Sequence, residues 1–207
     1  MNINSKNGFS LVELLVVVSI ISVMLGGIFV VFSAGESSWF TAEAGIALQE
    51  SLRRTLDHVT MELRQSKTSQ IQVFDGTGLN SSDIIRFSIP VICHNGDTLL
   101  DGSGDVAQWG ATLRWGCRDA ACMDADDSCT TADYEYIEYR LAAGDRLVRR
   151  VLDGNFDEVR EDIFANNMTD FQITNGSVLS IQATARVPTA MNRVLTAQTT
   201  TSLFVRN

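Results

Sequence analysis

The chain has 207 residues, of which 25 are Asp or Glu and 16 are Lys or Arg, so its formal net charge is −9. This length suits one globular domain plus an appendage, and it is sufficient to bury a hydrophobic core. Nucleic-acid-binding proteins normally present a basic face, so the acidic balance argues against DNA or RNA as a partner, with only a local basic patch left open.

Residues 11–32, LVELLVVVSIISVMLGGIFVVF, form an apolar run with a single charged residue, Glu13. As an α-helix the run would be about 33 Å long, enough to cross a bilayer hydrocarbon core of about 30 Å. A cleaved secretory signal is the main alternative, but the run is longer than such an apolar core and no small-residue cleavage site directly follows Phe32. We therefore predict an uncleaved membrane anchor with Lys6 on the cytoplasmic side.

An anchor alone does not explain Glu13, because an ionised carboxylate inside hydrocarbon costs about 2.5–3.5 kcal/mol. Residues 8–13, GFSLVE, follow a short polar leader and resemble the class III signal of type IV prepilins and the related pseudopilins. The resemblance implies that a prepilin peptidase cuts between Gly8 and Phe9 and methylates the new Phe9 amine. Glu13 would then pair with the Phe9 amine of a neighbouring subunit and set the register of a filament, since removing either partner would strand a buried charge.

The segment after the apolar run predicts first a weak point and then an amphipathic helix. Residues 33–45, SAGESSWFTAEAG, contain two glycines and several small polar residues, so we expect a break or a softened section there. Leucine and valine then recur at helical spacing, and the helix is expected to fade at residues 65–68 after packing this stripe on a sheet: Leu48, Leu52, Leu56, Val59 and Leu63. The charged residues of this helix, Glu62 among them, are expected mostly off the stripe.

Beyond residue 69 the chain reads as strands separated by turn clusters. Alternation or β-branched enrichment predicts strands at 71–74, 83–92, 111–115, 134–141, 146–152, 178–187 and 200–205. The clearest hairpin joins the fourth and fifth of these strands around the sequence AAGD. One helix followed by many strands predicts an α+β fold with the helix packed on an antiparallel sheet, which is also the pilin-like architecture that the resemblance implies.

We accordingly expect four parts along the chain. These are a leader peptide at 1–8, a transmembrane and assembly helix at 9–32, a linker with the amphipathic helix at 33–68, and a β-rich head at 69–207 that contains a cysteine-bearing loop at 93–133.

The cysteines of this loop invite two hypotheses, a zinc site and disulfides. With His94 they could supply zinc ligands, but the closely spaced pairs of usual zinc sites are missing, and export favours oxidation. We therefore expect disulfides. Three pairings are open, of which we favour one that closes a small loop and ties two predicted strands together: Cys122 with Cys129, and Cys93 with Cys117.

Carboxylates inside the loop raise the question of calcium. Asp124, Asp126 and Asp127 alternate as calcium ligands can, and some pseudopilins bind Ca²⁺. The stretch lacks the glycine and distal glutamate of an EF-hand loop, as do the segments at 101–105 and 153–159. We expect a solvated acidic loop and no resident metal, with Ca²⁺ as the alternative.

No pattern in the chain indicates catalysis, so we do not expect an enzyme. His58 and His94 have no serine or cysteine arrangement beside them, and no nucleotide-binding glycine motif or nucleophile-elbow motif occurs. His58 falls beside the apolar stripe and is expected to be a partly exposed helix residue. The long loop at 93–133, with Trp109 and Trp115, is the more plausible place for a binding function.

The resemblance extends, on shorter segments, to PilW-like minor pilins. These segments are AGIALQESLRRTLDHVTMELRQS, LVRRVLDG with IFANNMTDFQI, and the terminal LFVRN. Major pilins are generally shorter and often carry a proline in the anchor, whereas this anchor has Gly26-Gly27 and no proline. The resemblance thus implies a minor type IV pilin, a structural subunit of a pilus-priming and tip complex. The alternatives are a minor pseudopilin of type II secretion, of the J type, and a tip adhesin or DNA-uptake subunit.

The resemblance also implies the partners and the location. The partners would be other minor pilins, the major pilin, the prepilin peptidase and the inner-membrane assembly platform. Before assembly the chain would cross the inner membrane once with its head in the periplasm, and it would later reside in the extracellular filament or its tip.

Overall fold

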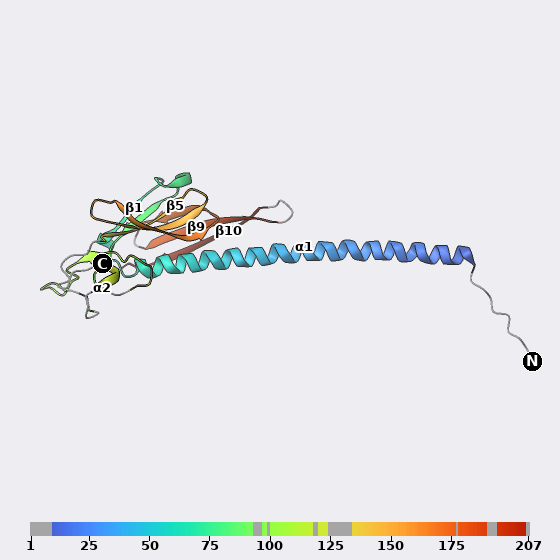
Figure 1. Ribbon diagram of the computed structural model, residues 1–207, viewed down its shortest axis with the longest axis horizontal. Helices are drawn as coiled ribbons and strands as arrows, with labels where there is room; N and C mark the ends of the chain where they lie inside the picture. The colour runs from blue at the N-terminus through green and yellow to red at the C-terminus, as the bar shows by residue number, and fades with distance from the viewer. Residues whose placement is uncertain are drawn as a thin grey trace, which may run out of the picture.

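The computed structural model describes most of the chain, without its first nine residues and parts of the cysteine-bearing segment. The described ranges are 10–92, 97–98, 100–117, 120–123, 134–176, 178–189 and 194–205, without the side chains of Ala120 and Cys122. A single long helix, α1, leads from the N-terminal side into a β-rich head (Figure 1).

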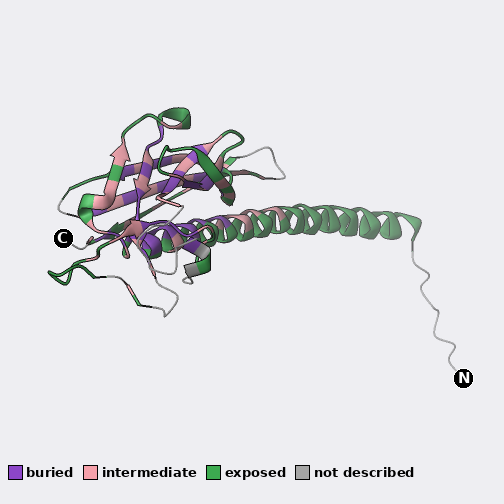
Figure 2. Cartoon of the chain, turned by 60° about the vertical axis from the view of Figure 1, so that its left-hand side comes forward, coloured by how far each residue is buried: buried purple, intermediate pink, exposed green. Residues whose placement is uncertain are grey.

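The helix α1 (Leu11–Leu63) contains 53 residues, which makes it about 80 Å long. Its N-terminal half is exposed, whereas its last turns are buried under the head (Figure 2). The predicted apolar stripe is confirmed, because all of its members are buried: Leu48, Leu52, Leu56, Val59 and Leu63. Each such side chain contributes about 1.5–3 kcal/mol of hydrophobic stabilisation, so this stripe is what holds α1 to the head.

The predicted break at residues 33–45 is wrong, because α1 continues through this segment. A glycine inside a helix costs only about 1 kcal/mol relative to alanine, and the neighbouring turns offset it. The hydroxyls bond to the helix itself: Ser37 Oγ donates to the carbonyl of Ala34 at 2.9 Å, and Thr41 Oγ1 donates to the carbonyl of Ser37 at 2.8 Å. Small polar residues are therefore accommodated within the helix here.

The described part of the head contains three antiparallel sheets. Their strand orders are β1-β2-β5-β6-β7, β10-β9-β8 and β3-β4. The strands are β1 (Ile71–Phe74), β2 (Ile84–Phe87), β3 (Ile89–Pro90), β4 (Trp109–Gly110), β5 (Tyr136–Ala142), β6 (Arg146–Leu152), β7 (Glu158–Asn166), β8 (Met168–Thr174), β9 (Leu179–Pro188) and β10 (Val194–Leu203). Short helical turns lie at η1 (Thr68–Gln70), η2 (Leu79–Ser81) and α2 (Ala120–Met123).

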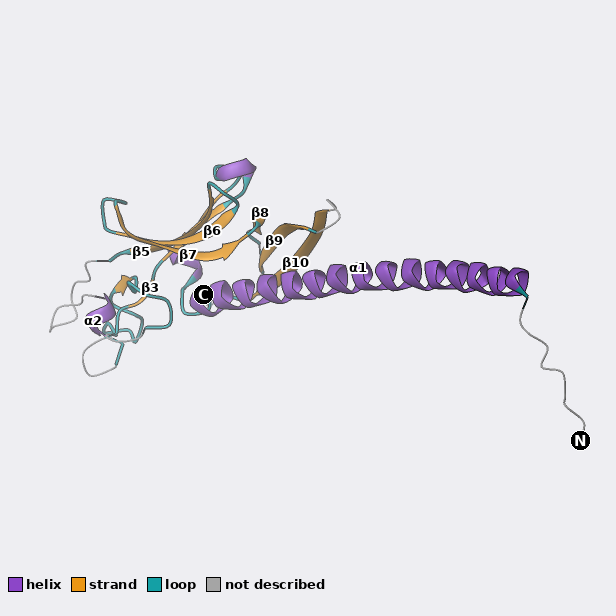
Figure 3. Cartoon of the chain, turned by 45° about the vertical axis from the view of Figure 1, so that its right-hand side comes forward, coloured by secondary structure: helices purple, strands orange, loops and turns teal. Residues whose placement is uncertain are grey.

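The sheets arch over the C-terminal part of α1 (Figure 3). The helix contacts β9 and β10 of the three-stranded sheet and β7 of the five-stranded sheet. One hydrophobic cluster joins the helix stripe to buried side chains of both sheets, for example Phe87, Ile137, Phe171 and Ile181. The predicted α+β class is confirmed: a long N-terminal apolar helix is packed on antiparallel β-sheets, as in a pilin-like fold.

Most predicted strands are present, and the clearest hairpin is confirmed. Strands β5 and β6 pair across the turn that contains Gly144 and Asp145, whose φ angles are +80° and +53°. The predicted strand at 83–92 is divided at Ser88 into β2 and β3, which belong to different sheets. The final predicted strand, at 200–205, overlaps the end of the longer β10, which stops at Leu203.

The strand predicted at 111–115 is wrong, and three strands were not predicted: β4, β7 and β8. Residues 111–117 are irregular, and the short strand β4 precedes them. Strands β7 and β8 were missed because both lie at the edges of their sheets. Charged or polar residues interrupt the apolar pattern of each strand. The chain passes from β7 to β8 at Asn167, whose φ of +61° is a left-handed conformation that asparagine tolerates better than most residues.

Candidate functional site

The first candidate site is the N-terminal end of α1. Ser10 stands at the N-cap position in an extended conformation, and its carbonyl accepts the first helical hydrogen bond, from Leu14 N at 3.1 Å. Glu13 lies in the first turn and is exposed. Unpaired N–H groups give a helix N-terminus a partial positive charge, which favours a carboxylate there. Gly8 and Phe9 lie outside the described residues, so cleavage between them stays a prediction.

The surroundings of Glu13 on α1 are apolar. The next charged residue along the chain is Glu36, and the 22 residues between the two would span about 33 Å as a helix. Within the described residues, α1 is the one helix that is long and apolar enough to cross a membrane. The apolar portion is exposed to its surroundings and not covered by the head, which fits a membrane anchor.

A second candidate site is a buried ion pair that fixes α1 to the head. Arg149 on β6 is fully buried, and its Nη2 lies 3.0 Å from Glu62 Oε1. Arg149 Nε also donates to Glu62 Oε2 at 3.1 Å, so the guanidinium contacts the carboxylate through two nitrogens. Two parallel bonds of this kind fix the mutual orientation of the partners as well as their distance.

Two further groups complete the cluster around this ion pair. Tyr139 on β5 donates its hydroxyl hydrogen to Glu62 Oε2 at 2.7 Å. Arg149 Nη2 donates to the carbonyl of Thr112 at 2.9 Å, and its Nη1 has no partner among the described side chains and backbone. The cluster thus joins the last turn of α1, two central strands and the segment that follows β4.

The sequence placed Glu62 with the charged residues mostly off the apolar stripe, and its burial was not predicted. Glu62 is 3% exposed and directly precedes Leu63, the last residue of the stripe. The available signal was Arg149, an arginine at a position where strand alternation in RLVRRVL points the side chain to the core, as it does for Leu147 and Val151. A core-facing arginine requires an acidic partner, and Glu62 supplies it.

Tyr139 gives the buried cluster a measurable pH dependence. Burial, with the nearby carboxylate of Glu62 adding to it, raises the pKa of Tyr139 well above its ordinary value of 10. A phenol whose pKa is raised in the folded state contributes stability that is complete below about pH 10 and is lost as the pH rises further. In an alkaline titration we expect the phenolate absorbance of Tyr139 to appear only as the head unfolds.

The Tyr139→Phe variant assigns that signal. The absorbance step that the variant lacks, relative to the unmodified chain, belongs to Tyr139, and circular dichroism at each pH shows whether the head is still folded. Ionisation of Tyr139 near pH 10 in a folded head would contradict the buried hydrogen bond to Glu62.

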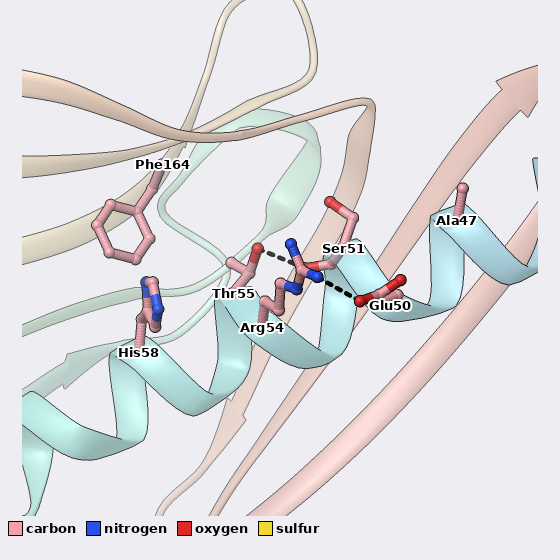
Figure 4. Close-up of a pocket in the computed structure, with 7 residues that line it drawn as sticks. All are labelled: Ala47, Glu50, Ser51, Arg54, Thr55, His58 and Phe164. Carbon is pink, nitrogen blue, oxygen red and sulfur yellow. Dashed lines mark hydrogen bonds and ion pairs between the residues drawn. The ribbon is translucent and has the colours of Figure 1, made fainter.

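An aromatic contact and a groove lie beside the buried cluster. The ring of His58 on α1 stacks on Trp115 at 4.1 Å between centroids and meets the edge of Phe164 on β7 at 5.5 Å. The same side of α1 borders a groove of about 450 Å³ in which Arg54 reaches Glu50 and His58 faces Phe164 (Figure 4). His58 is partly exposed, as predicted.

The outer face of the five-stranded sheet carries another charged cluster. Arg86, Glu138 and Arg150 occupy directly opposed positions on β2, β5 and β6. Glu138 lies 2.7 Å from Arg86 Nη2 and 3.2 Å from Arg150 Nη1, and the guanidinium of Arg86 lies over the Phe156 ring at 4.5 Å from its centroid. Opposite charges on adjacent strands stabilise a sheet by about 0.2–1 kcal/mol per pair, so we assign these residues a structural role.

Little of the predicted cysteine and metal chemistry falls on described residues. Cys117 takes part in a disulfide, and the side chains of Cys93, Cys122 and Cys129 lie outside the described residues, so the pairing stays a prediction. The same holds for His94 and for the calcium candidates Asp124, Asp126 and Asp127. In the part of the chain that the structure describes, no group of three or more His, Cys, Asp or Glu side chains is placed to hold a metal ion.

Comparison with known proteins identifies the N-terminal segment. Residues 3–29 match the family model described as the prokaryotic N-terminal methylation motif. No curated protein and no solved structure matches the chain. The matched residues include Gly8, Phe9, Glu13 and the first part of α1, and they support a type IV pilin-like class III signal peptide. The head lies outside the match.

Proposed function

We propose that the protein is a minor type IV pilin, a structural subunit that joins other minor pilins in a complex that primes the pilus and then caps its tip. The observation that carries the proposal is the methylation motif at residues 3–29, which lies directly on an exposed apolar helix with Glu13 in its first turn. That helix supplies an anchor before assembly and a packing surface for neighbouring helices afterwards. A pilin-like motif indicates pilin partners and processing by a prepilin peptidase in general.

The finer assignments are also proposals. The head would lie in the periplasm before assembly, and the major pilin and the inner-membrane platform would be further partners. The resemblance of the post-anchor helix and of LVRRVLDG to PilW-like proteins favours the minor group. The chain would have no catalytic activity of its own, so the motor and its nucleotide site would belong to other proteins. The remaining disulfide assignments are likewise expected and not observed.

In a filament the head would make the lateral contacts. The groove beside Glu50, Arg54 and His58 lies on the flank of α1, and polar rims of this kind are common at non-obligate interfaces. The buried cluster of Glu62, Tyr139 and Arg149 would hold the head at a fixed angle to α1 while the helix is extracted from the membrane.

Deletion of the gene tests the proposal. Lost piliation that is restored by the unmodified gene supports the priming role. Normal pili with lost protein secretion would support a type II secretion pseudopilin instead, and normal pili with poor attachment or poor DNA uptake would support an adhesin or uptake subunit.

A further inference from the structure

Two large aromatic side chains stand exposed on α1 between the apolar segment and the head. Trp39 is 71% exposed and Phe40 is 56% exposed. They follow residues 33–38, SAGESS, which come directly after the apolar run and include the charged Glu36. Both aromatics also precede Leu48, the first buried residue of the stripe that packs on the head.

Trp39 points away from the head. Ser37 and Thr41 are partly buried, and they lie on the side of α1 that leads into the buried stripe at Leu48. Trp39 is two residues from each of them, and each residue of an α-helix turns by about 100°, so its side chain leaves the opposite side of the helix. The head therefore does not cover Trp39, and its large exposed area needs another environment.

The spacing of Trp39 from Glu13 matches the thickness of a bilayer. The two residues are 26 positions apart on one uninterrupted helix, which corresponds to about 39 Å along the axis. A bilayer with its headgroup regions is about 40–45 Å thick. Helical side chains lean toward the N-terminus, which brings the Trp39 ring back toward the apolar segment by part of a turn.

The chemistry of the two ends agrees with this spacing. The indole ring of tryptophan is apolar with one N–H donor, and tryptophan is enriched at membrane–water interfaces. With Trp39 at one interface, Glu13 lies near the opposite edge of the bilayer, and in the filament the Phe9 amine of a neighbouring subunit would neutralise it. Only uncharged residues then lie between them, apart from Glu36, which stands three residues before Trp39, about 4.5 Å closer to the apolar run, at the edge of the headgroup region.

We propose that Trp39 is an interfacial anchor that binds the lipid headgroup region on the head side of the membrane and sets the depth of α1 before assembly. The inference rests on the membrane-anchoring part of the proposed function. The end of β9 lies near this part of α1, because Pro188 lines a groove together with Phe40 and Ala44, which follow Trp39 on the head side of the apolar run. With Trp39 in the headgroup region, the near end of the head would face the membrane surface.

The test uses the full chain reconstituted at low density in phosphatidylcholine vesicles whose acyl chains carry bromine, a quencher of tryptophan emission. One preparation carries bromine near the headgroups and another near the chain ends. The Trp39→Phe variant is the matched control, because the substitution is on an exposed position and leaves Trp109 and Trp115 in the head. The difference in emission between the two chains reports Trp39 alone.

We expect the Trp39 emission to be lost mainly with bromine near the headgroups, and the control chain to keep its emission in both preparations. Vesicle flotation distinguishes failure of the Trp39 anchor from failure of the whole chain to bind the membrane. A chain that floats with the vesicles but shows no quenching of Trp39, or stronger quenching by the deep bromine, overturns the anchor at Trp39 and leaves the membrane helix in place. A chain that does not float overturns the membrane anchoring itself, and the proposed function with it.

Discussion

Replacing Glu13 with alanine is expected to leave processing intact and to remove the protein from assembled filaments. The cleavage site lies between Gly8 and Phe9, upstream of the substitution, so the leader is still cut. In the filament the variant leaves the methylated Phe9 amine of a neighbour without its anionic partner in an apolar environment. Removing one member of a buried ion pair costs about 3–5 kcal/mol, which corresponds to a loss of incorporation of roughly a hundredfold or more.

The measurement is quantitative immunoblotting of sheared filaments against the membrane fraction, with the processed and unprocessed forms resolved by size. Glu13→Asp is the matched control, since it keeps the negative charge in the first turn of α1 and should restore a large part of the incorporation. Incorporation of Glu13→Ala at the level of the unmodified chain would refute the proposed pairing.

Replacing Arg149 with methionine is expected to destabilise the head by about 3–5 kcal/mol, because the carboxylate of Glu62 stays buried without its cation. This is a large part of the 5–15 kcal/mol that usually separates folded from unfolded states. The midpoint of urea unfolding of the full chain in detergent measures the loss. A double variant, Glu62→Leu with Arg149→Met, removes both charges and should regain most of the stability.

Arg53 provides the control for this comparison. Its side chain is 81% exposed and lies 4.0 Å from Asp57, also on α1, so Arg53→Met should change the free energy of unfolding by less than about 1 kcal/mol. An effect of Arg149→Met as small as that of Arg53→Met would show that the buried pair does not hold α1 to the head.

The sequence predicted well those parts of the fold that depend on local pattern. The spacing of Leu48, Leu52, Leu56, Val59 and Leu63 identified the buried side of α1, since the helical period alone decides which residues share a side. Strand β6 was predicted with its correct limits, because RLVRRVL lies between two turn signals.

The parts that depend on distant contacts could not be predicted in this way. The burial of Glu62 was not predicted, because its partner Arg149 is 87 residues away along the chain and becomes its neighbour only when the sheet folds over α1. Strand β7 was missed because an edge strand satisfies only one row of hydrogen bonds and tolerates charged residues. The wrongly predicted break at residues 33–45 had another cause: Ser37 and Thr41 bond to the helix carbonyls and do not end the helix.

The two candidate sites differ in the same way: one consists of residues adjacent in the sequence, and the other of residues brought together by folding. The motif at residues 8–13 was recognised from the sequence because its residues are adjacent, and the family model matches the same segment. The buried cluster around Arg149 combines residues from α1, β5, β6 and the segment after β4, and no short motif records it.

We expect the carboxylate of Glu13 to be neutralised in the filament by a newly made amine at Phe9 of a neighbouring subunit. Mass spectrometry of the protein purified from its native membrane shows whether this amine is made. The expected mature chain begins with N-methylated phenylalanine at position 9. A chain that keeps Met1, or one that is cut beyond Phe32, would have no amine at Phe9. Either result would contradict the proposed pairing with Glu13.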